Sequence, residues 1–391
     1  MTEISAAALQ RPDKAVKVLQ IITKGERGGA QSHVLTLSRE LIRLKVDVHV
    51  AIGGIDARPP LEEALHGLHL PIHRIPALGN SWNPLHLARA LRLLVSVVRT
   101  HSPDLLHAHS AMASVAARLA GLLTGTPVIY TVHGFAFKSG APWKHRLVAF
   151  AVEWILATLT RRMVCVSEHE RHLARWLPLP SARVTVIANG IEDTKHQYRV
   201  RTPSAETPPA IAMVARMAPP KRPDVLLQAL FQLREAMGHE VSATFFGDGP
   251  DLLAHRSLAV QLGLQHSCFR GEAHDIPSQL SSHAIFVLIS DHEGLPIALI
   301  EAMRAGMAIV ASDLPGVREM LPDEAHAFLV PPDAAAVSSA LRRLIESASL
   351  RASMGAAARR RYEQHYTAER MGVAVRTVYV TAISRLPMNK S

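Results

Sequence analysis

The chain has 391 residues, of which 48% are hydrophobic and 19% are charged, a balance that excludes a disordered protein and is typical of a globular one. This length exceeds one ordinary hydrophobic core and favours two domains. The net charge of +10 lies in residues 1–190, which carry 22 Lys and Arg against 12 Asp and Glu, whereas residues 191–391 carry 21 of each. Such a basic half suits an anionic partner, namely nucleic acid, acidic lipid or a phosphorylated substrate, although solvated arginines explain the charge equally well.

The sequence predicts neither a signal peptide nor a membrane-spanning helix. The N-terminus lacks a long apolar core behind a basic start, and the most apolar run, 147–160, is short and contains Glu153. We therefore expect a cytoplasmic protein that can rest peripherally on the cytoplasmic face of the inner membrane. The two cysteines, Cys165 and Cys268, lie beside apolar runs and are expected to be buried, reduced thiols.

Short β-branched runs alternate with amphipathic segments through the first half of the chain. Helices are expected at 32–45 and 85–100. This alternation predicts a parallel sheet with helices on both faces. The strands are expected at 17–23, 46–54, 104–110, 127–134, 163–168 and 184–190.

The same alternation restarts after residues 191–210, which are polar, proline-rich and without period and are therefore predicted to be a linker. The expected fold class is α/β, with two doubly wound, Rossmann-like domains facing each other across a cleft. We predict an N-terminal domain at 1–190, a second domain at 211–365, and a C-terminal helix at 366–391 that packs back on the first domain. The strands expected in the second half are 211–216, 242–247, 267–271, 284–290, 307–312 and 325–330.

Two stretches of the first half carry candidate site residues. Gly28 and Gly29 lie between a strand and a helix, where glycine lets backbone approach a phosphate or sugar and the helix N-terminus favours an anion. Neither a dinucleotide fingerprint nor a phosphate-binding loop is present, so a plain turn remains an alternative. His133 follows a predicted strand, where doubly wound folds bind ligands. His107 and His109 alternate on a strand, but with no third ligand evident we expect no metal there.

The second half offers cations after its first strand and a glycine turn after its second. Arg216 and Lys221, on a loop stiffened by two prolines, suit a diphosphate, although two exposed cations on a loop are the plainer alternative. Gly247, in the stretch FFGDGP, lines a nucleotide site or simply makes a turn, and the sequence leaves both readings open.

The stretch SDHEGLPIALIEAMRAG, residues 290–306, contains two acids separated by a predicted helix start. Glu293 lies in the loop after a strand, and Glu301 lies in the helix expected from about Pro296 to Arg304. The amide groups of Gly294 and Leu295 can donate to a phosphate or sugar oxygen. Helix capping for Glu293 and a solvated position for Glu301 are the structural alternatives.

Taken in order, these stretches resemble the retaining glycosyltransferases of family 4, which have the GT-B fold. Glu293 and Glu301 match the E-x7-E signature of that family. The resemblance extends from about residue 20 to about residue 330. It includes GERGGAQSHV, IANGIE, ARMAPPK, FFGDGP and ASDLPGVREML, with one departure, because Arg222 stands where glycine often follows the lysine.

The resemblance implies a role for each of these residues. Arg216 and Lys221 would bind the diphosphate of a UDP- or GDP-linked sugar, and Glu301 would accept hydrogen bonds from the ribose. Glu293, with the backbone of Gly294 and Leu295, would contact the donor sugar, and His133 would lie beside the sugar that is transferred. The remaining donor-binding positions would be those of the glycine loops, Gly28, Gly29 and Gly247.

The implied activity is that of a retaining, metal-independent hexosyltransferase without a cofactor. Two cations and a helix N-terminus can stabilise a departing diphosphate, and the sequence contains no Asp-x-Asp to bridge a metal. The acceptor would be a glycan or a polyprenyl-diphosphate-linked sugar in exopolysaccharide or cell-surface glycan synthesis, and no nucleic acid is expected. The basic, apolar stretch 138–162 would meet an anionic membrane, unless its apolar part is a core helix. A sugar-nucleotide epimerase of the same fold and a non-catalytic nucleotide-binding protein remain alternatives.

Overall fold

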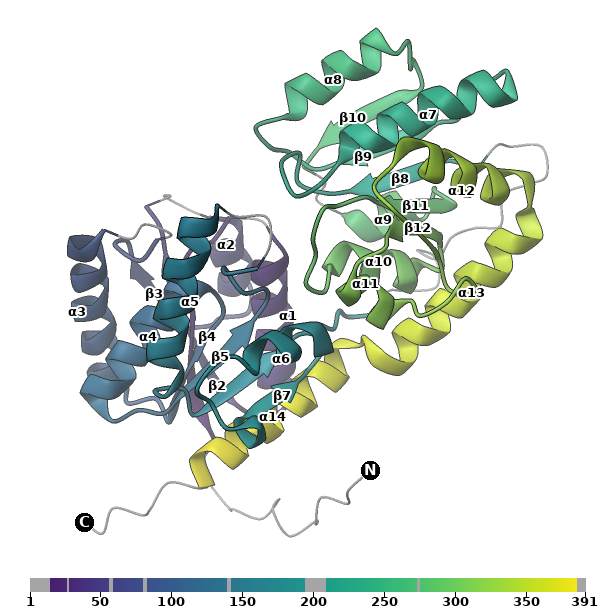
Figure 1. Cartoon of the computed structure of the whole chain (residues 1–391). Helices are drawn as coiled ribbons and strands as arrows, with labels where there is room; N and C mark the ends of the chain where they lie inside the picture. The colour runs from purple at the N-terminus through teal and green to yellow at the C-terminus, as the bar shows by residue number, and fades with distance from the viewer. Residues whose placement is uncertain are drawn as a thin grey trace. The chain divides into compact units, whose positions relative to one another are not determined.

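A computed structural model of the chain describes residues 15–26, 28–55, 59–79, 83–138, 142–193, 209–272 and 275–384. Most of the predicted linker, 194–208, therefore lies outside the described residues, as do the last seven residues of the predicted C-terminal helix. The described part contains two parallel β-sheets with helices packed against them (Figure 1). The predicted α/β fold class with two doubly wound sheets is confirmed.

The first sheet has seven strands in the order β3-β2-β1-β4-β5-β6-β7. The register is parallel where β1 meets β2 and β4, and the order reverses at β1, which is the hallmark of a doubly wound sheet. The sequence analysis missed β3, which has only four residues. The strands are β1 Lys17–Ile22, β2 Asp47–Gly53, β3 Ile72–Ile75, β4 Leu105–Ala108, β5 Val128–Val132, β6 Arg162–Cys165 and β7 Val184–Val186.

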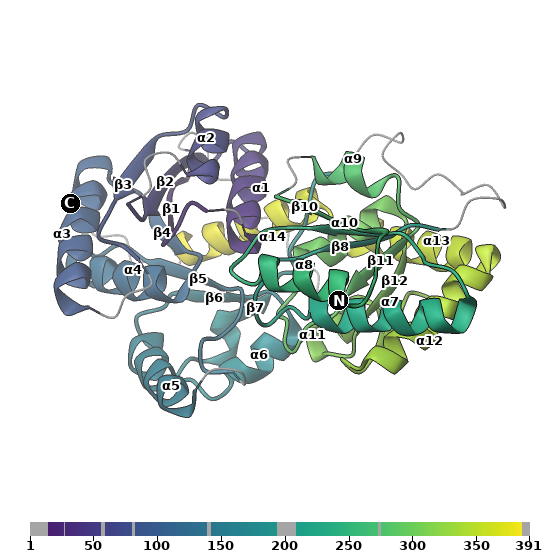
Figure 2. The same cartoon turned by 90° about the horizontal axis from the view of Figure 1, so that it is seen from above.

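The helices of the first half connect these parallel strands. Helix α3 packs on α4, and α2 packs on α1; Figure 2 shows α3 next to β3 at one edge of the first sheet. Asn83 caps α3, because its side-chain oxygen accepts a hydrogen bond from the Leu85 amide at 2.9 Å. The helices are α1 Gly29–Arg43, α2 Pro60–His66, α3 Pro84–His101, α4 Ala111–Thr124, α5 Trp143–Ala157 and α6 Glu168–Ala174, followed by the 3-10 turn Ser181–Arg183.

The second sheet has six parallel strands in the order β10-β9-β8-β11-β12-β13. Successive residues of β8 point to opposite faces, so that Ile211 joins one hydrophobic core and Ala212 joins the other. Both faces are therefore covered, as the continuous apolar strands require. The strands are β8 Ile211–Val214, β9 Ala243–Phe246, β10 Ser267–Gly271, β11 Ile285–Leu288, β12 Ala308–Ser312 and β13 Phe328–Val330.

The helices of the second half divide between the two faces of this sheet. Residues of α7, α8 and α12 belong to the core on one face, and residues of α9, α10, α11 and α13 belong mainly to the core on the other. Figure 1 shows α7 and α12 side by side over the sheet. The helices are α7 Pro223–Met237, α8 Leu252–Gln261, α9 Ile276–Leu280, α10 Ile297–Ala305, α11 Pro315–Met320, α12 Ala334–Glu346, α13 Ala348–His365 and α14 Ala368–Ser384.

The chain divides into two compact units. The first contains residues 1–131, 158–163 and 372–391, and the second contains 132–157 and 164–371. The end of α14 belongs to the first unit, where Gly372 lies so close to α1 that an added Cβ would be 2.5 Å from Glu40 Cβ. The boundaries of these two units differ from those of the predicted domains. The predicted domain boundaries stay a prediction.

Three smaller predictions concern the start of α10, the two cysteines and a membrane-spanning helix. Pro296 is the N-cap residue of α10 rather than part of its first turn, because its ψ of 122° is extended. Cys165 is a buried free thiol as predicted, whereas Cys268 is a free thiol that is only half-buried. No helix among the described residues is long and apolar enough to cross a membrane.

Candidate functional site

The loop after β8 presents the two predicted cations. Arg216 is exposed, and within the described part of the chain its guanidinium makes one long hydrogen bond, of 3.4 Å, to the Pro219 carbonyl. Lys221 is half-buried and forms a backbone bridge with Ser290, at the end of β11. The bridge places residues 215–222, which we call the lysine loop, against the loop that carries Glu293. Two loops that follow neighbouring parallel strands therefore meet at the carboxyl edge of the second sheet.

Lys221 and Glu293 form an ion pair across these two loops. The ammonium contacts Glu293 Oε1, and the two side chains are only 17% and 11% exposed. The sequence assigned Lys221 to a phosphate and Glu293 to a sugar, without foreseeing that each residue is the partner of the other in the unliganded protein. The pair keeps both charges compensated in a poorly solvated place.

Two carboxylates hold the guanidinium of Arg222, the residue that stands where glycine often follows the lysine in related loops. Its guanidinium binds Asp224 at 2.8 Å and Asp291 at 3.1 Å. The hydrogen bonds that Arg222 donates to Asp224 contribute most to raising the pKa of Arg222, and the one that it donates to Asp291 adds to them. Because its donors are turned to these carboxylates, Arg222 fastens the lysine loop to the loop after β11.

The start of α10 offers free backbone donors next to Glu293. Among the described residues, the amides of Gly294 and Leu295 have no acceptor, as is usual just before a helix. Asn189 Nδ2 donates to the Leu295 carbonyl at 3.0 Å and fixes the loop from behind. The aligned peptide dipoles of α10 add partial positive charge here, which makes this place suitable for an anionic or hydroxyl oxygen.

Glycine is required at two places around this loop by close backbone contacts. A Cβ on Gly294 would lie 2.5 Å from the His133 carbonyl oxygen, and one on Gly316 would lie 1.9 Å from the Gly294 carbonyl oxygen. Both contacts are with backbone, which cannot swing away as a side chain can. Three segments therefore pack closely at the Glu293 loop, and one of them is the backbone of His133, just after β5; the predicted contact of His133 with the sugar stays a prediction.

Gly247 has a structural reason to be glycine. Its φ is +129°, and a Cβ would lie 1.9 Å from the Ala215 carbonyl oxygen. The neighbouring amide of Met217 donates to the Asp248 carbonyl at 2.9 Å. The turn therefore holds the loop of Arg216 and Lys221 in place, which supports the turn reading; its role as a nucleotide contact stays a prediction.

Glu301 lies in the second turn of α10 and is half-buried, so it is not the solvated helix position that the sequence allowed. Burial raises the pKa of Glu301 to about 7, and Arg304, three residues further on, opposes part of that rise. Ionising this carboxylate is therefore costly in the unliganded protein. Hydrogen-bond donors from a ligand would favour the charged form.

A buried carboxylate that the sequence analysis missed lies behind the site. Glu170 is fully buried, forms an ion pair with Lys138, and accepts a hydrogen bond from the Phe135 amide at 3.1 Å. The Lys138 ammonium also lies 3.4 Å from the Glu293 carbonyl oxygen. The only signal in the sequence was the position of Glu170 shortly after a predicted strand end, which many polar residues share.

A pocket of about 730 Å³ opens beside Glu293. Its wall is largely aromatic and aliphatic, and the cations Lys138 and Arg146 stand in it. A ligand there would meet apolar surface, positive charge and the Glu293 loop together. The lining residues are Phe137, Lys138, Trp143, Arg146, Leu147, Phe150, His169, Leu173, Trp176, Asp291, His292, Glu293, Leu314 and Pro315.

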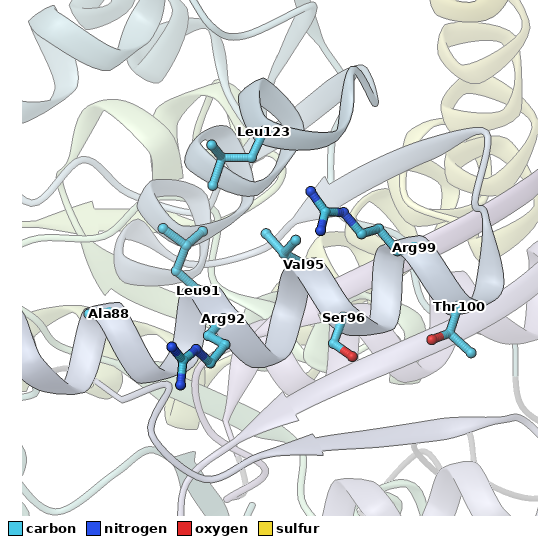
Figure 3. A pocket seen from close by; sticks show the side chains of 8 residues that line it. All are labelled: Ala88, Leu91, Arg92, Val95, Ser96, Arg99, Thr100 and Leu123. Carbon is cyan, nitrogen blue, oxygen red and sulfur yellow. The ribbon is translucent and has the colours of Figure 1, made fainter.

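A second hollow, of about 610 Å³, lies on α3 near the end of α4 (Figure 3). Leu91, Val95 and Leu123 point toward one another there, flanked by two arginines. It contains none of the predicted site residues and no acid, so we do not assign the chemistry to it. The lining residues are Ala88, Leu91, Arg92, Val95, Ser96, Arg99, Thr100 and Leu123.

The first unit contains the remaining histidine and glycine candidates. His107 is fully buried, with Nδ1 2.7 Å from Tyr379 Oη and Nε2 2.7 Å from Thr131 Oγ1. Burial lowers the pKa of His107 well below its ordinary value. A histidine whose two ring nitrogens are engaged in this way is a structural residue.

Gly28 is the N-cap of α1, and Gly29 is its first residue. The φ of Gly28 is 172°, an extended conformation open to any residue, and a Cβ would meet only the end of the Gln31 side chain at 2.7 Å. Nothing in this unit by itself requires glycine at position 28. The predicted donor contacts of Gly28 and Gly29 stay a prediction.

Two protein-family models cover most of the chain. "Glycosyltransferase Family 4" matches residues 27–195, and "Glycosyl transferases group 1" matches residues 194–361. The two matches meet at the predicted linker. The first includes His133, and the second includes the cations, the glycine turn and both glutamates.

Individual relatives agree with these models. The chain is 29% identical over 344 residues to the putative glycosyltransferase EpsD of Bacillus subtilis, which covers 83% of this chain and 87% of EpsD. It is 26% identical to a UDP-Gal:alpha-D-GlcNAc-diphosphoundecaprenol alpha-1,3-galactosyltransferase of Escherichia coli, over 66% of this chain and 70% of that protein. Anabaena HepE, solved with UDP and glucose, superposes with a TM-score of 0.79 at 19% identity, over 95% of this chain and all of HepE, and shows the same fold.

Proposed function

The chain belongs to the family 4 glycosyltransferases of the GT-B fold, and from this we propose that it transfers a hexosyl group from a UDP- or GDP-linked sugar to a polyprenyl-diphosphate-linked sugar. The observation that carries the proposal is the paired Lys221 and Glu293 beside the free amides of Gly294 and Leu295. The Escherichia coli relative supports the acceptor, since its name gives a diphosphoundecaprenol-linked sugar. EpsD, named only as a putative glycosyltransferase, supports the activity but not the acceptor.

On the donor side, the diphosphate would take the place of Glu293 as the partner of Lys221. Arg216, which is exposed and only loosely bonded, would supply the second cation. Once Lys221 pairs with the diphosphate, the Glu293 carboxylate would accept hydrogen bonds from the donor sugar. The amides of Gly294 and Leu295 would donate hydrogen bonds to oxygens of that sugar. Glu301 would accept hydrogen bonds from the ribose.

The transfer itself would proceed with retention and without a metal ion. The bond between the anomeric carbon and the phosphate oxygen breaks, and the acceptor oxygen forms its bond to that carbon on the same face. The acceptor's hydroxyl proton passes to the departing diphosphate. Lys221, Arg216 and the α10 dipole would stabilise the negative charge that develops on the diphosphate, the task that a divalent cation performs in enzymes with an Asp-x-Asp motif.

On the acceptor side, the pocket beside Glu293 fits a lipid-linked diphosphate sugar. Lys138 and Arg146 provide positive charge, and Trp143, Leu147 and Phe150 provide apolar wall. An isoprenoid diphosphate needs both kinds of surface within a short distance. Such an acceptor would place the reaction at the cytoplasmic face of a membrane, in the synthesis of exopolysaccharide or a cell-surface glycan.

Thermal unfolding with a panel of UDP-, GDP- and ADP-sugars tests the donor half of this proposal. We expect one nucleotide to raise the melting temperature, because a ligand that binds only the folded protein stabilises it by RT ln(1 + [L]/Kd), about 2.7 kcal/mol at a hundred times Kd. The shift should be smaller for Glu301→Ala and unchanged for the surface variant Arg342→Ala. A panel without any shift would refute the assigned donor site, and release of an isomerised sugar nucleotide would show an epimerase instead.

A further inference from the structure

Three histidines from three different elements of the first unit lie together. The rings of His49 and His73 are stacked with centroids 5.4 Å apart, and the ring of His101 lies 5.3 Å from His49 and 4.4 Å from His73. The His49 Nδ1 and His73 Nε2 atoms are 3.1 Å apart. One nitrogen from each ring lies within 4.8 Å of the others, close enough to bind one ion together.

The strand register explains this convergence. His73 on β3 pairs with Ala51 on β2, and His49, two residues before Ala51, points to the same face of the sheet. Helix α3 packs on β3 (Figure 2), and it ends at His101, whose ring lies 4.4 Å from that of His73. Residues spread over more than fifty positions of the sequence are therefore fixed in one place by two strands and one helix end.

Burial of His49 and His73 disfavours positive charge on their imidazoles. Burial is the main cause that lowers the pKa of both His49 and His73, that of His73 to about 4, and the neighbouring His101 lowers both further. An uncharged imidazole has one ring nitrogen with an available lone pair, and this is the form that binds a metal ion. The other charged groups that face His49 are Asp47, which acts in the opposite direction, and Lys17.

Asp47 provides the support that metal-binding histidines usually have. Its Oδ1 lies 3.5 Å from His49 Nε2, on the side of the ring away from His73. A carboxylate there favours the tautomer with the proton on Nε2 and leaves the Nδ1 lone pair facing the cluster. Lys17, 3.6 Å from the other oxygen of Asp47, holds that carboxylate.

We propose that His49, His73 and His101 form a structural binding site for a divalent transition-metal ion, best matched by Zn²⁺, in the first unit. Imidazole nitrogen is a preferred ligand of Zn²⁺. Two nitrogens on one tetrahedral zinc, each about 2.0–2.1 Å from it, lie about 3.3 Å apart, close to the spacing of His49 and His73. Water would complete the coordination, since His73 and His101 are half-buried rather than enclosed.

The role of this ion is to fasten β2, β3 and α3 together. His49 and His73 lie in the amino-terminal half of their strands, whereas parallel sheets bind substrates beyond their carboxyl ends. The ion is therefore separate from the sugar transfer, which we propose to be metal-independent. Because β3 is a four-residue strand at the edge of the sheet, it is the element that gains most from such a clamp.

Zinc titration of the untagged, chelator-treated protein against a chromophoric competitor tests the site. We expect His73→Ala and His101→Ala each to bind one Zn²⁺ fewer per chain than the wild type, and Asp47→Asn to weaken that binding by about 10- to 100-fold. His86→Ala, which removes an exposed histidine from the same helix as His101, is the matched control and should behave like the wild type.

Two further measurements keep the result independent of folding. Circular dichroism reports whether each variant is folded, and His101→Ala, at a half-exposed helix end, should be. Co²⁺ bound at the site should give the intense visible absorption of tetrahedral nitrogen coordination in the wild type and in His86→Ala, and not in His101→Ala. Equal zinc stoichiometry and affinity in the wild type and a folded His101→Ala would overturn the proposal.

Discussion

Lys221 and Glu293 are the residues around which the site is organised. Each lies on a loop after a strand of the second sheet, and in the unliganded protein each neutralises the other. A donor that carries a diphosphate and a sugar presents a partner for both at once. The pair is therefore suited to exchange one internal contact for two contacts with the substrate, which limits the cost of desolvating either charge.

Lys221→Ala tests the role of the cation at the diphosphate. We expect kcat to fall by about 10²- to 10³-fold, the usual effect of removing one group that stabilises developing negative charge. Steady-state kinetics with the donor found in the panel gives the value. Arg342→Ala removes an exposed positive charge from α12 of the same unit and serves as the control. A kcat for Lys221→Ala within twofold of the wild type would contradict the assignment.

Glu301 gives the unliganded protein a dependence on pH. Its folded pKa of about 7 lies above the ordinary value of 4.5, so ionisation disfavours the folded state as the pH rises through this interval. Glu301→Gln should therefore raise the melting temperature at pH 8 and change it little at pH 4. A melting temperature unaffected by the substitution at both values would show that the carboxylate is not held as described.

The same residue predicts how donor binding depends on pH. The ribose hydroxyls would donate to the ionised carboxylate, so donor affinity should increase as the pH rises from 6 to 8 in the wild type. Glu301→Gln should bind the donor more weakly at pH 8 and lose this dependence. Isothermal titration at both pH values checks it, and parallel curves for the two proteins would exclude the ribose contact.

At the scale of elements, α5 exposes several large apolar side chains to solvent. Trp143, Leu147, Val148, Trp154 and Ile155 are between 50% and 65% exposed, and Lys144 and Arg146 lie among them. The sequence left open whether this stretch is a core helix or a membrane-facing one. An exposed basic and aromatic helix is the arrangement that binds the interface of an anionic bilayer.

Flotation with anionic vesicles tests α5 as a membrane contact. The double variant Trp154→Ala/Ile155→Ala removes two exposed apolar side chains that do not line the pocket beside Glu293. We expect its partition to vesicles to fall at least about tenfold, because each buried side chain contributes about 1.5–3 kcal/mol when fully inserted. Leu253→Ala, at a 73% exposed position on α8, should float like the wild type. If the wild type does not float, α5 has no such role.

The elements of the site differ in how far the sequence predicted them. Alternating apolar runs predicted the two sheets, because strand periodicity is local, but β3 has the sequence Ile-His-Arg-Ile and is only partly buried, so it contains no apolar run to detect. The motifs located Glu293 and Glu301 on either side of the start of α10. They did not reveal the Lys221–Glu293 pair or the Lys138–Glu170 pair, because such contacts depend on loops that meet only in the folded chain.

At the scale of the whole molecule, the last helix completes the first unit. The Tyr379 hydroxyl on α14 meets His107 on β4 across 272 positions of sequence. Both residues are fully buried, so water cannot take the place of either one as the hydrogen-bond partner of the other. The first unit therefore depends on α14 for part of its buried interior.

Tyr379→Phe tests this dependence with little change of volume. It leaves the buried Nδ1 of His107 without its partner, and we expect a loss of about 1–3 kcal/mol in the free energy of unfolding. Denaturant unfolding measures it. Val373→Ala, at a 47% exposed position of the same helix, should change stability by less than about 0.5 kcal/mol. Equal stability of Tyr379→Phe and the wild type would mean that this bond does not hold α14.

The most direct test of the central claim is the product of the reaction itself. The protein is incubated with the sugar nucleotide that it binds and with a polyprenyl-diphosphate-linked sugar, without added Mg²⁺ or Mn²⁺. Mass spectrometry and NMR then give the composition and anomeric configuration of the product. We predict one added hexosyl residue whose anomeric configuration is that of the donor. A product of inverted configuration, or no transfer to any lipid-linked or free glycan acceptor by a protein that binds the donor, would contradict the account.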